Sequence, residues 1–225
     1  MPTPLVSKIA YEKFEAGFKS APNNLTQILR SHHAIEAQIH GALSHYLVLS
    51  PRLDLRRIPF LTKVDLLISL GSMNQLFYPF FAEANRLRNR FAHDPDAQLL
   101  EDDRAKIQNL YASCRANLAP KGWELSTPGR AMGALFQTVF LAARSIYEQG
   151  VNSRIQSRAL DQYIADEHPS LKNPTRSHFQ SEIDTKIAEI AKGLLRIEHP
   201  DVDYFDLYTF EDEKTSNAAS PKEGE

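Results

Sequence analysis

The chain has 225 residues, of which 42% are hydrophobic and 24% are charged, proportions typical of one large globular domain or of a domain with an extension. Its formal net charge of −2 excludes a strong overall attraction to nucleic acid, so any such binding must come from local clusters of basic residues. The single cysteine excludes an internal disulfide, and the lack of a signal-peptide pattern or of an apolar run near ~20 residues predicts a cytoplasmic protein without a membrane span.

The apolar pattern predicts an all-α protein. Glycine is scarce, with nine residues in the chain, and no segment shows the clear alternation of a half-buried strand. In chain order, helical periodicity predicts helices at about 5–19, 25–49, 60–70, 79–93 and 101–117. An asparagine after Pro22 can cap the second of these helices. We expect residues 5–118 to form one helical core.

A boundary containing proline and glycine follows this core. Thr127 followed by Pro128 then predicts the start of an apolar helix that ends at Gly150. Later helices are predicted at about 152–165 and 174–197. We expect residues 119–210 to form a helical extension packed on the core, and residues 211–225, which are polar and charged, to form a disordered acidic tail.

The densest group of chemically active side chains lies in residues 86–93, where three arginines, an asparagine and a histidine occur together. At 100° per residue, one side of the predicted helix is apolar and must face a core. The apolar side consists of Phe80, Ala84, Leu87 and Phe91. The opposite side consists of Asn85, Arg86, Asn89 and His93. The helix therefore presents a cation, two amides and an imidazole away from the core.

This set of side chains can bind and cleave an RNA phosphodiester without a metal ion. A histidine with a pKa near neutrality can act as the base for the attacking 2′-hydroxyl or as the acid for the leaving 5′-oxygen. Arginine stabilises the charge that develops on the non-bridging oxygens, and Asn89 can orient the substrate or the imidazole. The alternative is that basic residues near a helix C-terminus only favour the helix dipole and solvate the surface.

The motif is similar to the signature of the HEPN superfamily, in which an arginine, often followed by asparagine, precedes a histidine by a few residues. Here it reads Arg88-Asn89-Arg90-Phe91-Ala92-His93. The resemblance covers residues 5–117 and includes the all-α context and the position of the motif late in a helix. It implies a HEPN-like helical bundle that dimerises, so that two motifs form one composite cleft. Many such proteins are metal-independent endoribonucleases, including toxins of toxin–antitoxin and phage-defence systems.

The resemblance implies roles for individual residues. His93 is expected to be the acid/base, Arg88 to clamp the transition state and Asn89 to position them. Supporting roles are expected for Glu36, Arg86 and Arg90. The products would carry 2′,3′-cyclic phosphate and 5′-hydroxyl ends, and DNA, which lacks the 2′-hydroxyl, would not be cut. No cofactor or metal is expected, and the expected partners are RNA, a second copy of the chain and a cognate antitoxin protein.

A different class of function stays open beside this one. A chain of the same fold could be a non-catalytic RNA- or nucleotide-binding module, or a regulatory or structural protein that uses the basic face as a protein interface. The near-neutral net charge and the acidic tail favour this alternative.

The spacing of the motif raises a geometric question. Arg88 and His93 are five residues apart, which corresponds to ~140° around an ideal helix. Either the helix frays before Pro95 and frees His93, or Arg86, which is seven residues from His93 and nearly eclipsed with it, shares the role. We expect Arg88 to be the functional arginine because the asparagine follows it directly.

Glu36 lies in the apolar stripe of the predicted helix 25–49, and His32 lies inside the same stripe. A buried carboxylate without a partner costs several kcal/mol or takes up a proton, so a donor is expected nearby. Arg88 lies on the flank of the motif helix's own stripe and is the expected partner, with Arg86 as the second choice. The alternative is a tyrosine or a backbone group unrelated to the motif.

Two further groups are weaker candidates. His33, Glu36 and His40 follow an i, i+3, i+7 spacing that could bind a divalent metal ion, but no other ligand accompanies them in the sequence. The connection after the second helix holds Arg52, Arg56 and Arg57. These arginines are either a solvated connection or contacts to RNA phosphates.

Overall fold

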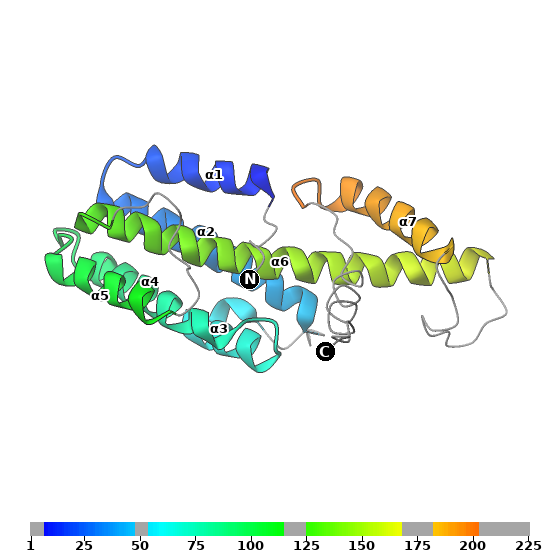
Figure 1. Ribbon diagram of the computed structural model, residues 1–225, viewed down its shortest axis with the longest axis horizontal. Helices are drawn as coiled ribbons and strands as arrows, with labels where there is room; N and C mark the ends of the chain where they lie inside the picture. Colours follow the sequence, from blue (N-terminus) through cyan, green and yellow to red (C-terminus); the bar gives the residue numbers. More distant parts are fainter. Residues whose placement is uncertain (1–6, 48–53, 115–124, 168–181, 203–225) are drawn as a thin grey trace, which may run out of the picture. The chain divides into compact units, whose positions relative to one another are not determined.

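A computed structural model describes residues 7–47, 54–114, 125–167 and 182–202, and all regular structure in these ranges is helical (Figure 1). The α-helices are α1 (Lys8–Lys19), α2 (Asn24–Tyr46), α3 (Phe60–Ser69), α4 (Tyr78–His93), α5 (Glu101–Ser113), α6 (Pro128–Glu167) and α7 (Glu182–Glu198). Two short 3₁₀ helices are η1 (Leu55–Arg57) and η2 (Gln75–Phe77). The predicted all-α class is confirmed.

Local sequence signals set the helix ends. The Asn23 side chain accepts a hydrogen bond from the Thr26 backbone N–H at 2.8 Å and so caps α2. Pro79 lies in the first turn of α4, where a proline costs no hydrogen bond. Gly71 follows α3 with a φ of 71°, a left-handed conformation that favours glycine. The predicted end of the second helix near residue 49 lies outside the described residues.

The chain divides into two compact units, residues 1–148 and 149–225. This division falls later than residue 118, the expected end of the core, because the first part of α6 supplies buried side chains to the first unit. The prediction that a helix ends at Gly150 is wrong, since α6 continues through it. One helical glycine costs only about 1 kcal/mol, and Val151 and Ile155 continue the buried apolar spacing beyond it.

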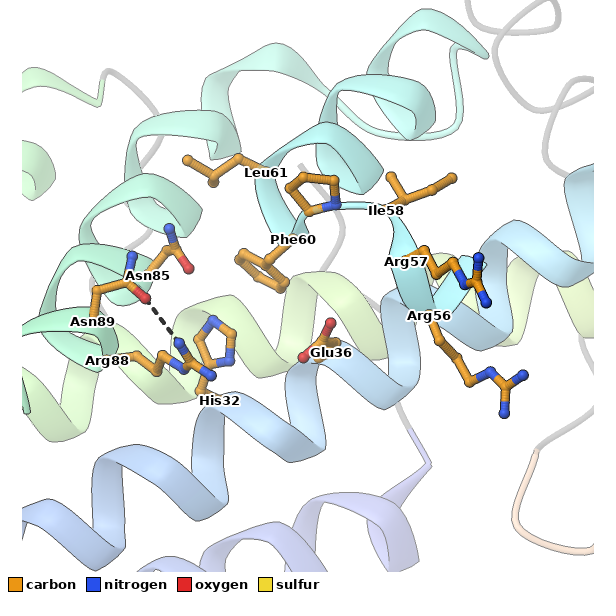
Figure 2. Close-up of a pocket in the computed structure, with 11 residues that line it drawn as sticks. His32, Glu36, Arg56, Arg57, Ile58, Phe60, Leu61, Asn85, Arg88 and Asn89 are labelled. Atoms are coloured by element: carbon orange, nitrogen blue, oxygen red, sulfur yellow. Dashed lines mark hydrogen bonds between the residues drawn. The ribbon is translucent and has the colours of Figure 1, made fainter. Parts of the chain in front are cut away.

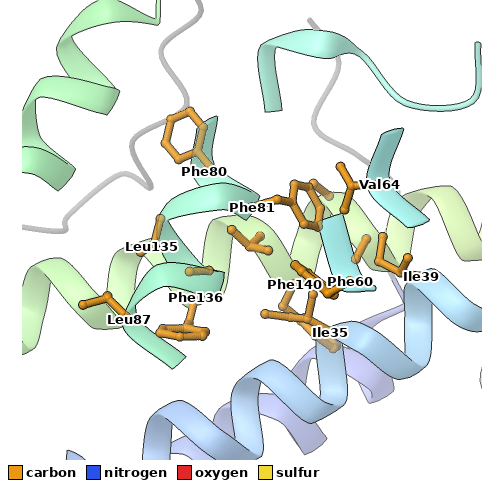
Figure 3. Close-up of a cluster of buried hydrophobic side chains, with 14 of the residues drawn as sticks. Ile35, Ile39, Phe60, Val64, Phe80, Phe81, Leu87, Leu135, Phe136 and Phe140 are labelled. Atoms are coloured by element: carbon orange, nitrogen blue, oxygen red, sulfur yellow. The ribbon is translucent and has the colours of Figure 1, made fainter. Parts of the chain in front are cut away.

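The core of the first unit is built from the apolar faces of its helices (Figure 3). The predicted stripe of the motif helix is buried as expected, and it packs beside residues of α2, α3 and α6. Members labelled in Figure 3 are Ile35, Ile39, Phe60, Val64, Phe80, Phe81, Leu87, Leu135, Phe136 and Phe140. The helix α1 joins them through Phe14, whose ring stacks on Phe140 with the centroids 4.0 Å apart. Burial of each large side chain contributes roughly 1.5–3 kcal/mol.

The second unit consists, in the described residues, of the end of α6 and of α7 with the turn that follows it. Arg158 of α6 forms an ion pair with Glu198 at the end of α7. The Lys186 ammonium lies 5.9 Å from the centroid of the Tyr163 ring. The predicted start of the last helix at residue 174 and the predicted disordered tail lie outside the described residues.

Candidate functional site

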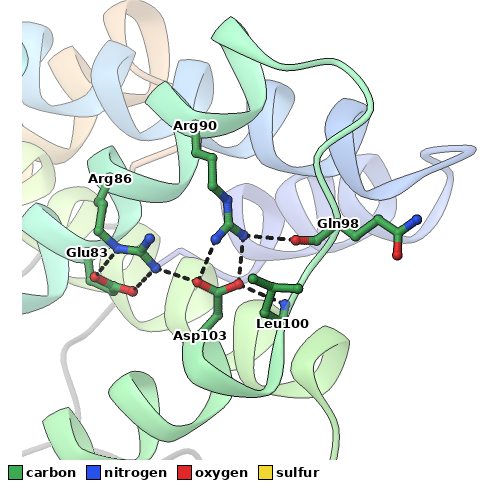
Figure 4. A network of polar contacts seen from close by, with 6 residues as sticks. All are labelled: Glu83, Arg86, Arg90, Gln98, Leu100 and Asp103. Atoms are coloured by element: carbon green, nitrogen blue, oxygen red, sulfur yellow. Dashed lines mark hydrogen bonds and ion pairs between the residues drawn. The ribbon is translucent and has the colours of Figure 1, made fainter.

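The three arginines of α4 have different partners. Arg86 and Arg90 each form an ion pair with Asp103 of α5, with nitrogen–oxygen distances of 2.6 Å (Figure 4). Arg86 also pairs with Glu83 at 2.6 Å, and Arg90 donates to the Gln98 carbonyl at 3.1 Å. These two arginines therefore hold α4 against α5.

Asp103 is the centre of this polar network. Its side chain is 1% exposed and also accepts the Leu100 backbone N–H at 2.9 Å. Burial raises the pKa of Asp103, but hydrogen bonds from Arg90, from the Leu100 amide and from Arg86 outweigh it and lower the pKa to about 2. The network is therefore ionised at neutral pH. Arg86 and Arg90, expected to support the functional site, instead have these structural partners and do not line the cavity described next.

Arg88 lines a different part of the surface, a cavity of about 440 Å³ between α2, α4 and the segment from η1 to α3 (Figure 2). Asn85 and Asn89 of α4 line it as well, and α2 contributes His32 and Glu36. The remaining lining residues are Arg56, Arg57, Ile58, Pro59, Phe60 and Leu61. The structure thus brings together the predicted Arg88, Asn89 and Glu36.

The Arg88 side chain has no acidic partner. Its Nη1 donates to the Asn89 Oδ1 at 2.9 Å, and no carboxylate among the described residues forms an ion pair with it. The guanidinium is half-buried and faces the cavity (Figure 2). Arg88 is therefore the motif arginine that can still bind an external anion.

Glu36 does not pair with Arg88 or Arg86, and that prediction is wrong. The Lys63 Nζ of α3 donates to the Glu36 Oε1 at 2.7 Å. The Lys63 side chain is 2% exposed, whereas that of Glu36 is 36% exposed at the cavity. A lysine is rarely buried unless it is paired, so the general preference of lysine for the surface does not point to α3 as the source of the partner. The signal was present, because Lys63 occupies the same helical stripe as Phe60, Val64 and Leu67.

Both members of this pair matter for the charge in the cavity. Burial raises the pKa of Glu36, but the hydrogen bond and the charge of Lys63 outweigh it, with smaller contributions from His32 and Arg88. The pKa of Glu36 lies below its usual value as a result. Glu36 is therefore an ionised hydrogen-bond acceptor in a cavity otherwise rich in donors.

His32 is a functional candidate that the sequence did not single out as a site residue. It is 4% exposed, its ring centroid lies 4.4 Å from that of Phe60, and its Nε2 has no hydrogen-bond partner. Burial lowers the pKa of His32 to about 4, and Glu36 and Asn85 offset part of this effect. His32 is therefore neutral near pH 7, which makes it a hydrogen-bonding group and not a cation.

His93 lies apart from this cavity. It is the last residue of α4, its side chain is exposed, and it is not among the lining residues. The helix does not fray before Pro95, because α4 is regular through His93 and the Asp94 N–H bonds the Arg90 carbonyl at 2.9 Å. The angle of ~140° between Arg88 and His93 is therefore retained. One chain alone does not bring the two predicted catalytic side chains together.

The η1 helix adds cations at the rim of the cavity. Asp54 caps η1, pairs with Arg56 at 2.9 Å and lies 3.6 Å from Arg57. Both arginine side chains are more than four-fifths exposed and can move toward a ligand. With Arg88 and Lys63 they outnumber the carboxylates of Glu36 and Asp54, so the local charge is positive. Arg52 lies outside the described residues.

Comparison with known proteins adds no relative. No family model, no curated protein and no solved structure matches the chain. Within the described ranges, no helix combines the length and apolar character that crossing a membrane requires. In the same ranges, no three histidine, cysteine, aspartate or glutamate side chains lie together as metal ligands, so His33, Glu36 and His40 do not assemble a metal site.

Proposed function

We propose that the protein is a metal-independent endoribonuclease of HEPN type, active as a homodimer. The observation that carries the proposal is the Arg88 side chain. Its guanidinium faces a positively charged cavity without an acidic partner among the described residues, whereas its motif neighbours Arg86 and Arg90 both pair with Asp103 and Arg86 pairs with Glu83 as well. An arginine without a carboxylate partner can donate its paired N–H groups to a phosphate, which supports binding of a phosphate group here.

The chemistry follows from the side chains available. Arg88 would stabilise the charge that develops on the non-bridging oxygens, with its guanidinium oriented by the 2.9 Å hydrogen bond to Asn89. The attacking 2′-hydroxyl must lose a proton and the leaving 5′-oxygen must gain one. His93 of a second copy would supply this proton transfer, because His93 of the same chain lies outside the cavity. The products would be a 2′,3′-cyclic phosphate and a 5′-hydroxyl.

A cleavage assay in the presence of EDTA tests the proposal. We expect the purified full chain to cut RNA, and the variants Arg88→Ala and His93→Ala to lose about 10²–10⁴-fold of the rate, the usual contribution of an acid/base. Matched controls are Arg30→Ala and His33→Ala, which alter exposed residues of α2 that do not line the cavity and should retain the rate. A requirement for added metal, or full activity of His93→Ala, would contradict the mechanism.

A second candidate is a non-catalytic RNA- or nucleotide-binding module of the same fold. It is favoured by the distance of His93 from the cavity and by the low pKa of His32, about 4, because neither imidazole then serves as an acid/base in one chain. Such a module would bind RNA with an affinity that falls with salt and depends on Arg88, but would not cut it.

Growth of cells that express the protein distinguishes the endoribonuclease from the binding module. A toxin or phage-defence endoribonuclease slows growth, and His93→Ala relieves the effect, whereas a binding module affects wild type and His93→Ala alike. A cognate antitoxin protein, if the chain is a toxin, would restore growth when it is co-expressed.

A further inference from the structure

Two opposite charges face the same cavity without forming an ion pair. Arg88 and Glu36 both line it, yet Glu36 accepts a hydrogen bond from Lys63, and Arg88 donates one to Asn89. Lys63 donates a hydrogen bond to the Glu36 Oε1, while the Glu36 Oε2 accepts none from the described residues. The cavity therefore offers a free anion-binding group and a free, charged acceptor to one ligand (Figure 2).

We propose that this cavity binds one guanine nucleotide of the RNA, with a phosphate at Arg88 and the Watson–Crick edge of the base at Glu36. The inference rests on the proposed function in taking RNA as the substrate. It goes beyond that function in assigning a base preference to Glu36, which would be a specificity-determining residue.

The choice of guanine follows from the donors and acceptors of the four bases. Guanine presents two adjacent donors, N1–H and the N2 amino group, to a carboxylate. Adenine and cytosine each place a ring-nitrogen acceptor beside their amino group, and uracil flanks its N3–H with two carbonyl oxygens. A carboxylate that already accepts from Lys63 repels those acceptors. Unstacked bases of RNA are commonly read on this edge.

The other walls of the cavity fit a nucleotide. Ile58, Phe60 and Leu61 provide an apolar surface for a flat ring, and the amides of Asn85 and Asn89 can reach base or ribose atoms. His32 supplies a further group, since its Nε2 is buried without a partner beside Phe60. A volume of about 440 Å³ lies within the usual range for small-ligand sites, roughly 300–1,000 Å³.

A small ammonium ligand would satisfy Glu36 but not the rest of the cavity. Such a ligand would approach the cations Arg56, Arg57 and Arg88, and the Lys63 ammonium beside Glu36. The neutral N–H donors of guanine avoid this repulsion and leave the negative charge of the ligand on the phosphate.

Direct binding of nucleotides to the full-length wild-type protein tests the inference without any mutation. Calorimetry would use 5′-GMP, 3′-GMP, 5′-IMP, 5′-AMP, guanosine and inorganic phosphate. IMP retains the N1–H but lacks the N2 amino group. We expect a GMP to bind about tenfold or more tightly than IMP and AMP, the usual value of a hydrogen bond to a charged group. Equal affinity for GMP and AMP would overturn the proposal.

Two variants test whether the preference for guanine comes from the Glu36 carboxylate. Glu36→Gln should reduce GMP affinity to that of AMP, whereas Asp65→Asn, which removes an exposed carboxylate from α3, should leave the preference unchanged. Because Glu36→Gln leaves Lys63 buried without its counterion, the double variant Glu36→Gln/Lys63→Met is measured in parallel. A guanine preference that survives in the folded double variant would refute the role of Glu36.

Oligonucleotides distinguish RNA from a free guanine nucleotide as the ligand. A short RNA with one central guanine should bind His93→Ala about tenfold more tightly than the same RNA with adenine. A preference for free GMP without a preference in RNA would overturn the proposal as stated. Guanine-specific binding without cleavage of any RNA would contradict only the proposed endoribonuclease, and cleavage without base preference would contradict only this inference.

Discussion

At the residue scale, the three arginines of the motif helix differ in what surrounds them. Arg86 and Arg90 lie about one turn apart on one side of α4 and pair with the buried Asp103, whereas Arg88 lies about 160° around the helix from each of them and faces the cavity. The same residue type therefore pairs with a buried carboxylate in one direction and faces a solvent-accessible cavity in the other. This difference predicts opposite effects on stability and on RNA binding.

We expect Arg90→Ala to lower the free energy of unfolding by about 1–3 kcal/mol, because Asp103 stays buried with one of its charged donors removed. Arg88→Ala should change the free energy of unfolding by no more than about 0.5 kcal/mol, since removal of the Arg88 side chain leaves no buried carboxylate unpaired. Urea denaturation, monitored by circular dichroism, measures the free energy of unfolding of each variant. Equal destabilisation by the two substitutions would contradict the assignment of structural and functional arginines.

His32 makes a pH-dependent contribution to stability. Its pKa is about 4 in the folded chain, mainly because of burial, and 6.5 is its usual value. The unfolded chain therefore binds more protons between these values, so stability falls as the pH drops from about 6.5 to about 4, by up to about 3 kcal/mol. Denaturation midpoints across this range should show the decrease, and His32→Gln should remove it. A flat profile in the wild type would refute the burial argument.

At the element scale, one close approach between α2 and α6 depends on a glycine. A Cβ at Gly41 would lie 2.8 Å from the Cδ2 and Cε2 atoms of Tyr147, closer than carbon atoms pack. The Tyr147 ring is itself held, with the Arg144 guanidinium 5.0 Å from its centroid and the His45 ring centroid 5.5 Å away. Gly41 thus permits the spacing of two core helices.

We expect Gly41→Ala to destabilise the fold, because overpacking costs typically about 1–3 kcal/mol and exceeds the gain of about 1 kcal/mol in helix propensity. Gly17 of α1 is the matched control, since a Cβ there would meet nothing within 4 Å. Gly17→Ala should therefore stabilise the protein slightly. Thermal unfolding should show a lower midpoint temperature for Gly41→Ala and a slightly higher one for Gly17→Ala. Midpoint shifts of the same sign in both variants would argue against the close contact.

At the scale of the whole molecule, the first unit needs the beginning of α6. Leu135, Phe136 and Val139 are fully buried in its core. A chain truncated after residue 118, the boundary expected from the sequence, lacks this whole set. A chain truncated after residue 148 retains it.

We therefore expect residues 1–148 to unfold cooperatively and residues 1–118 to lack a cooperative transition. The free energy lost with several buried side chains exceeds the typical total stability of a domain, about 5–15 kcal/mol. Heat capacity or near-ultraviolet circular dichroism would record the difference. A cooperative transition of equal midpoint in the shorter chain would contradict the importance of α6 for this core.

The proposed composite site also belongs to this scale. If Arg88 of one copy works with His93 of another, a mixture of Arg88→Ala and His93→Ala proteins should recover about a quarter of the wild-type cleavage rate, since half of the dimers are mixed and each mixed dimer has one intact site. Each variant alone should be inactive. If the mixture shows no recovery while wild-type protein cuts RNA, the two residues do not act across an interface.

Local sequence patterns are enough to predict the helical class, most helix starts and the buried face of the motif helix. The stripe of Phe80, Ala84, Leu87 and Phe91 and the cap at Asn23 were predictable because periodicity and capping involve residues a few positions apart. Arg88 was selected on a different ground, because Asn89 follows it directly; periodicity alone placed Arg86 and not Arg88 opposite the core, whereas in the structure Arg88 and Asn89 line the cavity.

The partner of each charged side chain depends instead on how the helices pack together. Glu36 bonds Lys63 from α3, Asp103 from α5 bonds Arg86 and Arg90, and these choices leave Arg88 without an acid among the described residues. Helical periodicity specifies a direction for a side chain but not which distant segment lies there. Ion pairing acts over a few ångströms, so the charge of the cavity was decided only when the helices packed together.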